Sequence, residues 1–356
     1  MDFRDFTLFD VFWKNKSIYL ILSINYNPID EKDLDISLNQ FNLKKLKRKI
    51  VKDEYEPILI LIYDDCNVDI DKDLSVKIVY GDIHYSKKIE KVITKDTPGF
   101  LSITTLFKGD YRLFPNYYKY YKGQGVEHFF MYYNGLLNDD IKEVFNYEDV
   151  TLIEWDFRYW NYLPASPHLP RCPYGSKLGA SVWCKYCHHA QVGQINHALH
   201  KYGKDNYQYM IFNDLDEYFY IHNIKLSDHI RLNPNFHSFL FKNLWAKALD
   251  ESLGIQGDLL IDENGPYLPE RVVFPDKLVG RGKSLYLLSS VDFIGIHTTN
   301  LIEDSKINKN HIFFHICNIG IPHRGQLRPG GGGDRERHPS WAKGVIKLNL
   351  DFLNLS

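Results

Sequence analysis

The sequence has little of what marks exported, membrane-spanning or disulfide-stabilised proteins. It has five cysteines in 356 residues, an odd number that does not indicate a disulfide framework. The aliphatic runs "IYLILSI" and "PILILIY" are far shorter than the roughly 20 residues that span a bilayer. The start, "MDFRDFTLFD", places charges where a secretory signal needs an apolar stretch. We therefore expect a soluble protein of the reducing cytoplasm with no membrane span.

The sequence also has no excess of charge of one sign. Its 43 Lys and Arg against 45 Asp and Glu give a net charge of -2, which lacks the basic footprint of nucleic-acid-binding proteins. Hydrophobic residues make up 44% of the chain, enough for a packed core. The 15% of aromatic residues suit surfaces that stack on sugars, although biased codon usage would also produce them.

Residues 1–98 predict a small β-rich N-terminal domain. Three β-branched and aromatic runs, "SIYLILSINY", "EPILILIYDD" and "LSVKIVYGDIHY", are separated by charged or turn-forming stretches. The stretch "TKDTPG" then places two breakers, Pro98 and Gly99, at the expected domain boundary.

Residues 99–356 predict a larger α/β domain. The apolar runs "FLSITTLF", "EHFFMYYN", "VTLIEW" and "YQYMIFND" read as strands. Helical patterns over 111–125, 138–147 and 185–203 alternate with them. Such alternation indicates βαβ units and a mainly parallel sheet. The second half holds further short strands and a Gly-rich basic segment, "HRGQLRPGGGGDRERHPSW", which we expect to be a mobile loop.

The segment "YQYMIFNDLDEYFYI" carries three carboxylates between two apolar runs. Asp214 and Asp216 directly follow the first run, at the sheet edge where open α/β folds bind ligands. Residues two apart in an extended chain share a face, so the pair offers oxygen ligands to Mg²⁺ or Mn²⁺. Burying such carboxylates without a cation or a basic group is costly. The alternative is a solvated acidic turn. We expect Glu217 not to be one of the metal pair but to anchor the following turn or a group that supports the metal ligands.

"NDLDEYF" resembles the Asp-x-Asp segment of glycosyltransferases with the GT-A fold, nearest to family 92 and related family 2-like enzymes. "TTLFKGDYRLFPNYYKYYKGQGVEHFFMYYNG" is similar to that group's opening strand–helix–strand, and "HAQVGQINHALHKYG" resembles the helix before its metal motif. The resemblance covers about 100–325 and is good over 104–220. It implies a GT-A-like, Rossmann-like domain that moves a sugar from a nucleotide-sugar, with UDP as the expected nucleotide, to a glycan or glycoconjugate acceptor.

The same resemblance implies residue roles. Asp214 and Asp216 would hold a divalent cation that bridges the donor's two phosphates and stabilises the leaving nucleoside diphosphate. A histidine from a late strand commonly completes such a site, and His315 is the first candidate. His311 and His297 are its rivals, and a buried core histidine is the alternative. The positions expected to bind the donor are Thr105, Lys108, Asn134, Gln191 and Arg324, with Arg328 a second loop arginine.

An inverting reaction also needs a carboxylate that deprotonates the acceptor hydroxyl. Glu270 matches a Glu-Arg pair of the family and is the first candidate, with a structural pairing to Arg271 as the alternative. Other carboxylates that qualify by position are Asp258, Asp262, Glu263 and Asp292. The chain departs from the family pattern at Tyr133, at Gly109–Asp110 and at Asn116. These positions lie near the base and ribose in such enzymes, so the identity of the nucleotide stays open.

The stretch "WCKYCHH" offers competing chemistry. Cys184 and Cys187 have the spacing of a thioredoxin-type redox motif, and with His188 they also mimic a haem attachment site. Neither context fits, because the motif does not follow a first strand and no export signal precedes it. Structural zinc, held with Cys172 and His188 or His189, remains open beside ordinary thiols on a helix.

Two other functions remain possible at this stage. A nucleotide-sugar-binding or carbohydrate-binding protein without activity would be expected to lose a metal aspartate, and both aspartates are present. A nucleotidyltransferase also uses paired aspartates, but it normally has a Gly-rich phosphate loop near its first strand. The corresponding stretch here, "TTLFKGDYRL", is not such a loop.

Overall fold

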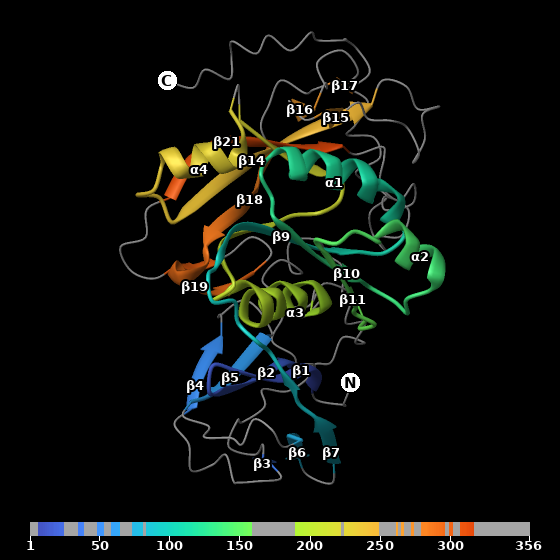
Figure 1. Cartoon of the computed structure of the whole chain (residues 1–356), viewed down its shortest axis with the longest axis vertical. Coiled ribbons are helices and arrows are strands. Elements are labelled where there is room, and N and C mark those ends of the chain that lie inside the picture. Colours follow the sequence, from blue (N-terminus) through green and yellow to red (C-terminus); the bar gives the residue numbers. More distant parts are fainter. Residues whose placement is uncertain are drawn as a thin grey trace, which may run out of the picture. The chain divides into compact units, whose positions relative to one another are not determined.

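The computed structural model describes residues 6–24, 35–38, 48–52, 58–64, 73–80, 83–158, 189–221, 224–248, 261–262, 265–266, 272–273, 279–295, 299–301 and 307–316. The chain divides into two compact units, whose elements can be followed in Figure 1. Unit 1 is formed by residues 1–98, 157–206 and 292–300, and unit 2 by residues 99–156, 207–291 and 301–356. Both this division and the one expected from sequence break after Pro98, but the segment 157–206 groups with the N-terminal strands. Whether 1–98 and 99–356 are separate domains stays a prediction.

Unit 1 contains two sheets that share one hydrophobic core. The first has the order β4-β5-β2-β1-β8 and is antiparallel except where β8 pairs with β1. The second, β3-β6-β7, is antiparallel throughout. Their strands are β1 (Phe6–Lys14), β2 (Ser17–Ile24), β3 (Asp35–Leu38), β4 (Arg48–Lys52), β5 (Ile58–Tyr63), β6 (Ser75–Tyr80), β7 (Ile83–Lys88) and β8 (Glu90–Lys91). Leu20, Leu61 and Val76 lie in the same buried cluster, so the two sheets pack on each other.

Strand β5 is buried along its whole length, as its unbroken run "ILILIY" implies. Leu59 and Leu61 belong to the core shared by the two sheets. Helix α3 (His189–His197) contacts β1, β2 and β5. A Cβ atom added to Gly193 of α3 would lie 2.5 Å from the Phe9 ring, so this close approach requires glycine. The helix continues as the π-helical segment η4 (Ala198–Gly203) and ends at Gly203, as expected.

Unit 2 contains a sheet of nine described strands, in the order β11-β10-β9-β12-β18-β14-β21-β13 with β17 paired to β14. The first four are mutually parallel. Strand β18 is antiparallel to both neighbours, and β13 is antiparallel to β21. The strands are β9 (Gly99–Phe107), β10 (His128–Tyr133), β11 (Val150–Glu154), β12 (Tyr207–Phe212), β13 (Glu217–Tyr220), β14 (Ser238–Ala248), β17 (Val272–Val273), β18 (Val279–Leu287) and β21 (Ile307–Ile316). A further pair in unit 2 is β15 (Ile261–Asp262) with β16 (Gly265–Pro266), whereas the pair of β19 (Val291–Ile294) with β20 (Thr299–Leu301) lies mostly in the 292–300 segment of unit 1.

Strands β14 and β21 are also parallel to each other. The sheet as a whole is mixed, so the expectation of a mainly parallel sheet holds for its first four strands and not for the rest. Parallel neighbours need a long crossover, usually a helix. The first half of unit 2 supplies α1 (Phe114–Gly123) after the short helix η2 (Tyr111–Leu113), and then α2 (Asp139–Val144). After β13, the described residues supply only α4 (Leu226–Leu232) and the short helix η6 (Leu288–Ser290). The two-residue period of a strand indicates where the strand lies but not its direction. The sequence therefore did not reveal the antiparallel strands that follow β12.

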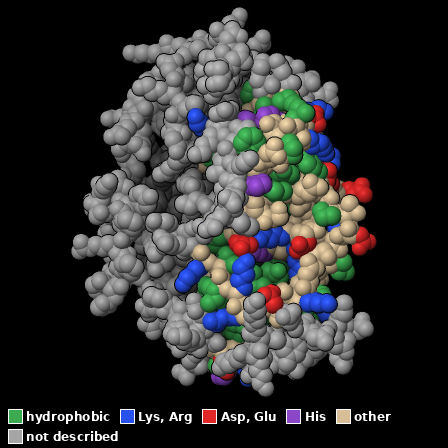
Figure 2. Space-filling view, turned by 90° about the vertical axis from the view of Figure 1, so that its left-hand side faces the viewer, with side chains coloured by type: hydrophobic (Ala, Val, Ile, Leu, Met, Phe, Trp, Pro, Cys, Tyr) green, Lys and Arg blue, Asp and Glu red, His purple; other side chains and the backbone are tan. Residues whose placement is uncertain are grey.

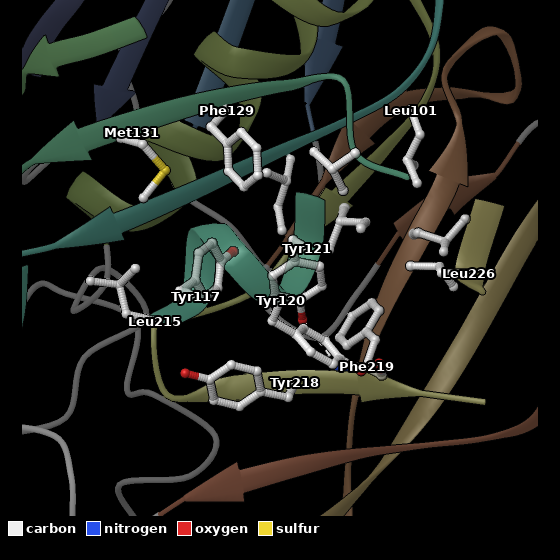
Figure 3. Close-up of a cluster of buried hydrophobic side chains, with 14 of the residues drawn as sticks. Leu101, Tyr117, Tyr120, Tyr121, Phe129, Met131, Leu215, Tyr218, Phe219 and Leu226 are labelled. Carbon is white, nitrogen blue, oxygen red and sulfur yellow. Dashed lines mark hydrogen bonds between the residues drawn. The ribbon is translucent and has the colours of Figure 1, made fainter. Parts of the chain in front are cut away.

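Aromatic residues of α1 build much of the core of unit 2. Phe114, Tyr117 and Tyr121 repeat at helical spacing and are fully buried. Figure 3 shows Tyr117, Tyr120 and Tyr121 on α1, with Tyr218 and Phe219 beside them on β13. The tyrosine content of this segment therefore serves the core rather than an exposed stacking surface.

Glycine ends helix α1, as the sequence predicts. Gly123 is its last residue, and Gly125 follows with a φ angle of 90°, the left-handed conformation that favours glycine after a helix. A Cβ atom at Gly125 would also lie 2.3 Å from the Ser227 hydroxyl oxygen. Both constraints fix the turn that leads into β10.

Surface charge on the described residues is mixed. On the face shown in Figure 2, acidic and basic side chains lie among one another rather than in separate patches. This agrees with the net charge of -2.

Candidate functional site

The Asp-x-Asp segment lies where the strand order of unit 2 reverses. Strand β9 is flanked by β10 on one side and by β12 on the other, and ligands of open α/β sheets bind outside the carboxyl ends at such a point. Strand β9 ends at Phe107 and β12 at Phe212, and residues 213–216 follow directly. The structure thus places Asp214 and Asp216 at the sheet edge predicted from sequence.

Glu217 closes this turn with its own side chain. The backbone N–H of Asp214 donates to Oε2 of Glu217 (2.9 Å), and the backbone N–H of Glu217 donates to the carbonyl of Asp214 (3.1 Å). The Asn213 side chain donates from Nδ2 to the carbonyl of Glu217 (2.8 Å). The prediction that Glu217 anchors the turn is confirmed.

Buried tyrosines of α1 form hydrogen bonds to the same turn. The Tyr117 hydroxyl donates to Oδ1 of Asn213 (2.6 Å), and the Tyr121 hydroxyl donates to the carbonyl of Glu217 (2.9 Å). Tyr121 also accepts from Nδ2 of Asn213 (2.6 Å) and from the backbone N–H of Phe219 (3.0 Å). These bonds connect a buried helix to both ends of the Asp-x-Asp segment, so the core sets the shape of the turn.

The hydroxyls of these tyrosines stay protonated. Burial raises the pKa of Tyr117, Tyr120 and Tyr121 well above the usual 10.0, because the charged phenolate is poorly solvated in the core. Tyr120 donates to the carbonyl of Phe219. All three therefore act as permanent hydrogen-bond donors to the segment.

Lys283 supplies a positive charge to the segment. It lies on β18, and its Nζ atom is 3.2 Å from Oδ2 of Asp214 and 3.2 Å from Oε2 of Glu217. Its side chain is 11% exposed. Burial would lower the pKa of Lys283, but the charges of Asp214 and Glu217 outweigh burial and raise it above the usual 10.5. Lys283 is therefore charged, and both carboxylates face a full positive charge.

The segment gathers three carboxylates. Asp216 is 3% exposed and Glu217 is 2% exposed, and Lys283 pairs with Asp214 and Glu217. Buried carboxylates are stabilised by a nearby positive charge, and carboxylate oxygens are the ligands that Mg²⁺ and Mn²⁺ prefer. The residues at this site therefore fit a hard divalent cation in donor type.

His315 is placed near the segment through its backbone. The register of β13 and β21 pairs His315 with Glu217, so the two residues are direct cross-strand neighbours. The His315 side chain lies outside the described residues. Among the side chains that are described, no three His, Cys, Asp or Glu gather as a metal cluster. The metal site and its third ligand stay predictions.

Three of the expected donor-binding residues end up at the same sheet edge, and two are engaged with the protein. The buried Thr105 hydroxyl donates to the carbonyl of Asn213. Asn134 is buried, and its Nδ2 donates to the carbonyl of Trp155 (3.0 Å). Lys108 follows β9 and is exposed, so its charge faces solvent near the carboxyl end of that strand. Their roles in donor binding stay predictions.

Other candidates lie elsewhere. Gln191 is buried on α3 in unit 1, and its donor role also stays a prediction. Asp292, a candidate base, is assigned to unit 1, where it pairs with Lys204 (2.6 Å) and Lys49 (2.8 Å). Burial would raise the pKa of Asp292, but these lysines lower it to about 2, which makes it a weak base.

His311, a rival for the metal role, is packed in the core. Its ring lies 4.8 Å from that of His229 and 5.1 Å from that of Phe241. Burial, with the nearby His229, lowers its pKa to about 4. It lies four residues before His315 on β21, roughly 13 Å along a strand, so it is distant from the residue paired with Glu217. His311 is therefore a buried core histidine, which was the alternative to a metal ligand.

Several predicted residues lie outside the described part of the chain. These are the candidate bases Glu270, Asp258 and Glu263, the loop residues Arg324 and Arg328, the histidines His297 and His188, and the cysteines Cys66, Cys172, Cys184, Cys187 and Cys317. Asp262 is described only as part of β15. The zinc alternative and the cytoplasmic location inferred from the cysteines stay predictions for the same reason.

Neither Lys283 nor the hydroxyls of Tyr117, Tyr120 and Tyr121 were identified from the sequence. Lys283 lies among glycine, arginine and serine in "VGRGKSLYL", a polar stretch that does not indicate a buried lysine. Nothing in the sequence indicated which carboxylate it would meet. The tyrosine spacing in α1 indicated a buried face but not that its hydroxyls would reach the Asp-x-Asp turn.

A family model for glycosyltransferase family 92 matches residues 102–319, more than half of the chain. The chain belongs to glycosyltransferase family 92. The matched region starts within β9 and runs past the end of β21, so it contains the whole reversal point and the Asp-x-Asp segment. The prediction of a glycosyltransferase from this family is confirmed.

Structure and sequence comparisons beyond the family model are distant. The mannosyltransferase Ktr4p from S. cerevisiae is similar at 9% identity and a TM-score of 0.28, over 58% of this chain and 61% of that one. The family 92 chain thus spans less than two thirds of that protein's length. No match was found among the curated proteins. Among the described helices, none has the length and apolarity to cross a membrane.

Proposed function

We propose that this family 92 protein is a metal-dependent hexosyltransferase with a GT-A-like fold. It takes a sugar from a nucleotide-sugar, with UDP as the expected nucleotide, and gives it to a glycan or glycoconjugate. The observation that carries the proposal is the acidic Asp-x-Asp segment, with Asp216 buried, at the carboxyl edge of β12. Four parallel strands lead to that edge, and the strand order reverses there.

Asp214 and Asp216 are the residues that hold the cation in this proposal, with His315 as the expected further ligand. Mn²⁺ or Mg²⁺, when bound, supplies positive charge that stabilises the leaving nucleoside diphosphate. The protein's own contribution is preorganisation. Glu217 and the α1 tyrosines fix the turn before the donor arrives, so little reorganisation is needed during reaction.

Lys108 and the segment after β10 complete the donor site in this proposal. Lys108 is exposed at the end of β9 and carries a charge suited to a phosphate or ribose-phosphate oxygen. Asn134 and Thr105 position the backbone on either side of the crevice. Glu270, Gln191 and Arg324 keep their predicted roles as base and donor-binding residues.

The test is transfer or hydrolysis from a panel of UDP- and GDP-sugars with Mn²⁺. The wild-type protein should release nucleoside diphosphate from at least one donor, and chelation should stop the release. Asp216→Asn should lower the rate by about a hundredfold or more, because it removes charge that the cation needs. Asp228→Asn is the matched control, since Asp228 is exposed on α4 and, among the described residues, pairs with Arg231 at 3.6 Å.

Two results would contradict the proposal. One is release that proceeds equally well in Asp216→Asn and in the wild type. The other is binding of a nucleotide-sugar with no turnover under any condition, which is the behaviour of a binding protein without transferase activity.

A further inference from the structure

Lys283 is held rigidly beside the Asp-x-Asp segment. Strand β18 pairs with β12 so that Ser284 lies opposite Phe212, which places Lys283 next to the first residue of the turn. On the other side β18 pairs with β14, and a Cβ atom at the neighbouring Gly282 would lie 3.0 Å from the carbonyl of Phe241. Pairing on both sides therefore fixes the backbone position of Lys283 within the sheet.

The ammonium of Lys283 has bonding capacity beyond its two carboxylates. A lysine ammonium carries three N–H donors, and Asp214 and Glu217 take two of them at 3.2 Å each. The described residues provide no further acceptor for the third donor. An ammonium so placed, beside a segment rich in carboxylates that suit a divalent cation, also suits an anion that arrives together with that cation.

Lys283 and a divalent cation also compete for the same oxygen. Oδ2 of Asp214 is the atom that faces Lys283, and Asp214 is one of the two expected cation ligands. Like charges a few ångströms apart repel, so Lys283 weakens cation binding while no anion is present. A diphosphate reverses this effect, because its oxygens attract both the lysine and the cation.

We propose that Lys283 makes cation binding depend on diphosphate binding. With no donor, it occupies Asp214 and keeps cation affinity low. With donor, its third N–H bonds to a diphosphate oxygen, which draws the ammonium toward the anion and weakens its hold on Asp214, so that this carboxylate can bind the cation. This inference rests on the proposed function, because it takes the ligand to be the diphosphate of a nucleotide-sugar.

Two binding measurements on the full chain test the inference. The first is the affinity for Mn²⁺ alone, followed by electron paramagnetic resonance. The second is the affinity for inorganic pyrophosphate at saturating Mn²⁺, followed by calorimetry. The variants are Lys283→Gln and Lys283→Met, which remove the charge, and Lys283→Arg, which keeps it. Lys142→Gln is the matched control, because Lys142 is exposed on α2 and its partner within the described part of the chain is Asp139 at 3.2 Å.

The two affinities should move in opposite directions. In Lys283→Gln the affinity for Mn²⁺ alone should rise roughly tenfold, because repulsion at short range is lost. The affinity for pyrophosphate should fall roughly tenfold, because a charge-assisted hydrogen bond is lost. Lys283→Arg should stay close to the wild type for Mn²⁺ alone, and Lys142→Gln should match the wild type in both. Lys283→Met carries the same expectation as Lys283→Gln and replaces it where the glutamine variant does not fold.

A common fall of both affinities would overturn the inference and leave Lys283 as a support of the turn. No change in pyrophosphate affinity would overturn it as well, and so would a wild-type protein that binds neither probe. The outcome is separate from that of the proposed function. Opposite shifts in the two affinities, in a protein that turns over no nucleotide-sugar, would support the coupling and contradict the transferase activity.

Discussion

The hydroxyl of Tyr121 on α1 donates to the carbonyl of Glu217 across 2.9 Å. The two residues are 96 positions apart in sequence, and the bond joins the buried face of a helix to the turn that carries Asp214 and Asp216. The acidic turn therefore has its shape set by the core beneath it. A change in that core should affect the site without touching any ligand.

Tyr121→Phe tests this connection. The variant should lose about 1–3 kcal/mol of unfolding free energy, because the N–H groups of Asn213 and Phe219 lose their acceptor in a buried place. Tyr218→Phe is the matched comparison in the same cluster. The Tyr218 hydroxyl is buried and meets no hydrogen-bond partner in the described part of the chain, so its removal should be neutral or stabilising. Denaturant unfolding of both variants gives the answer, and equal losses would show that the Tyr121 bonds contribute nothing specific.

In unit 1, Asp10 should control stability in acid. Oδ2 of Asp10 is 2.9 Å from Nε2 of His197 and 2.8 Å from Nζ of Lys201, and Lys87 contacts its other oxygen at 2.6 Å. Burial would raise the pKa of Asp10, but the bond from His197 and these charges outweigh burial and hold it well below the usual 3.8. A lowered carboxylate pKa stabilises the fold above the unfolded value, so this contribution is lost as the pH falls below 3.8.

Asp10→Asn should therefore flatten the loss of stability below pH 3.8. At neutral pH it should cost about 3 kcal/mol, because Lys201 stays buried with only Glu90 to balance it. Urea unfolding across the acid range measures both effects. Asp73→Asn is a suitable control, since Asp73 is an exposed carboxylate that pairs with Lys88. If the unfolding free energy of Asp10→Asn falls below pH 3.8 as steeply as that of the wild type, the assignment to Asp10 is contradicted.

His311 should lower the stability of the fold in a higher pH range than Asp10 does. Burial and the neighbouring His229 lower its pKa from 6.5 to about 4. In that interval the unfolded chain binds a proton that the folded chain does not, so stability falls as the pH drops below 6.5. The total loss by pH 4 is about 3 kcal/mol. His311→Phe fits the ring cluster with Phe239 and Phe241 and should weaken this pH dependence. The slope of unfolding free energy between pH 4 and 6.5 is the measurement, and a slope equal to that of the wild type would refute the assignment.

The sequence was enough to locate the candidate site because that site depends on local pattern. The apolar run before Asp214 defined β12, and the break after it placed the carboxylates at a strand end. The helix over 114–123 was also visible, because its buried residues repeat at helical spacing and Gly125 follows it.

The parts that were missed depend on contacts between distant residues. Lys283 meets Asp214 across 69 positions, and no local pattern pairs them. The antiparallel direction of β18 was hidden because a strand has the same period in either direction. The packing of α3 on the N-terminal strands was hidden for a similar reason, since a helical pattern shows which face is buried but not what covers it.

The most direct test of the central claim is the dependence of nucleotide binding on Mn²⁺. UDP and GDP affinities are measured with and without Mn²⁺ in the wild type, in the Asp214→Asn, Asp216→Asn double variant and in Asp228→Asn. The account predicts that Mn²⁺ raises the affinity for one nucleotide at least roughly tenfold in the wild type and in Asp228→Asn, and has no such effect in the double variant. A folded double variant that keeps the full Mn²⁺ effect, or a wild-type protein that shows none, would contradict it.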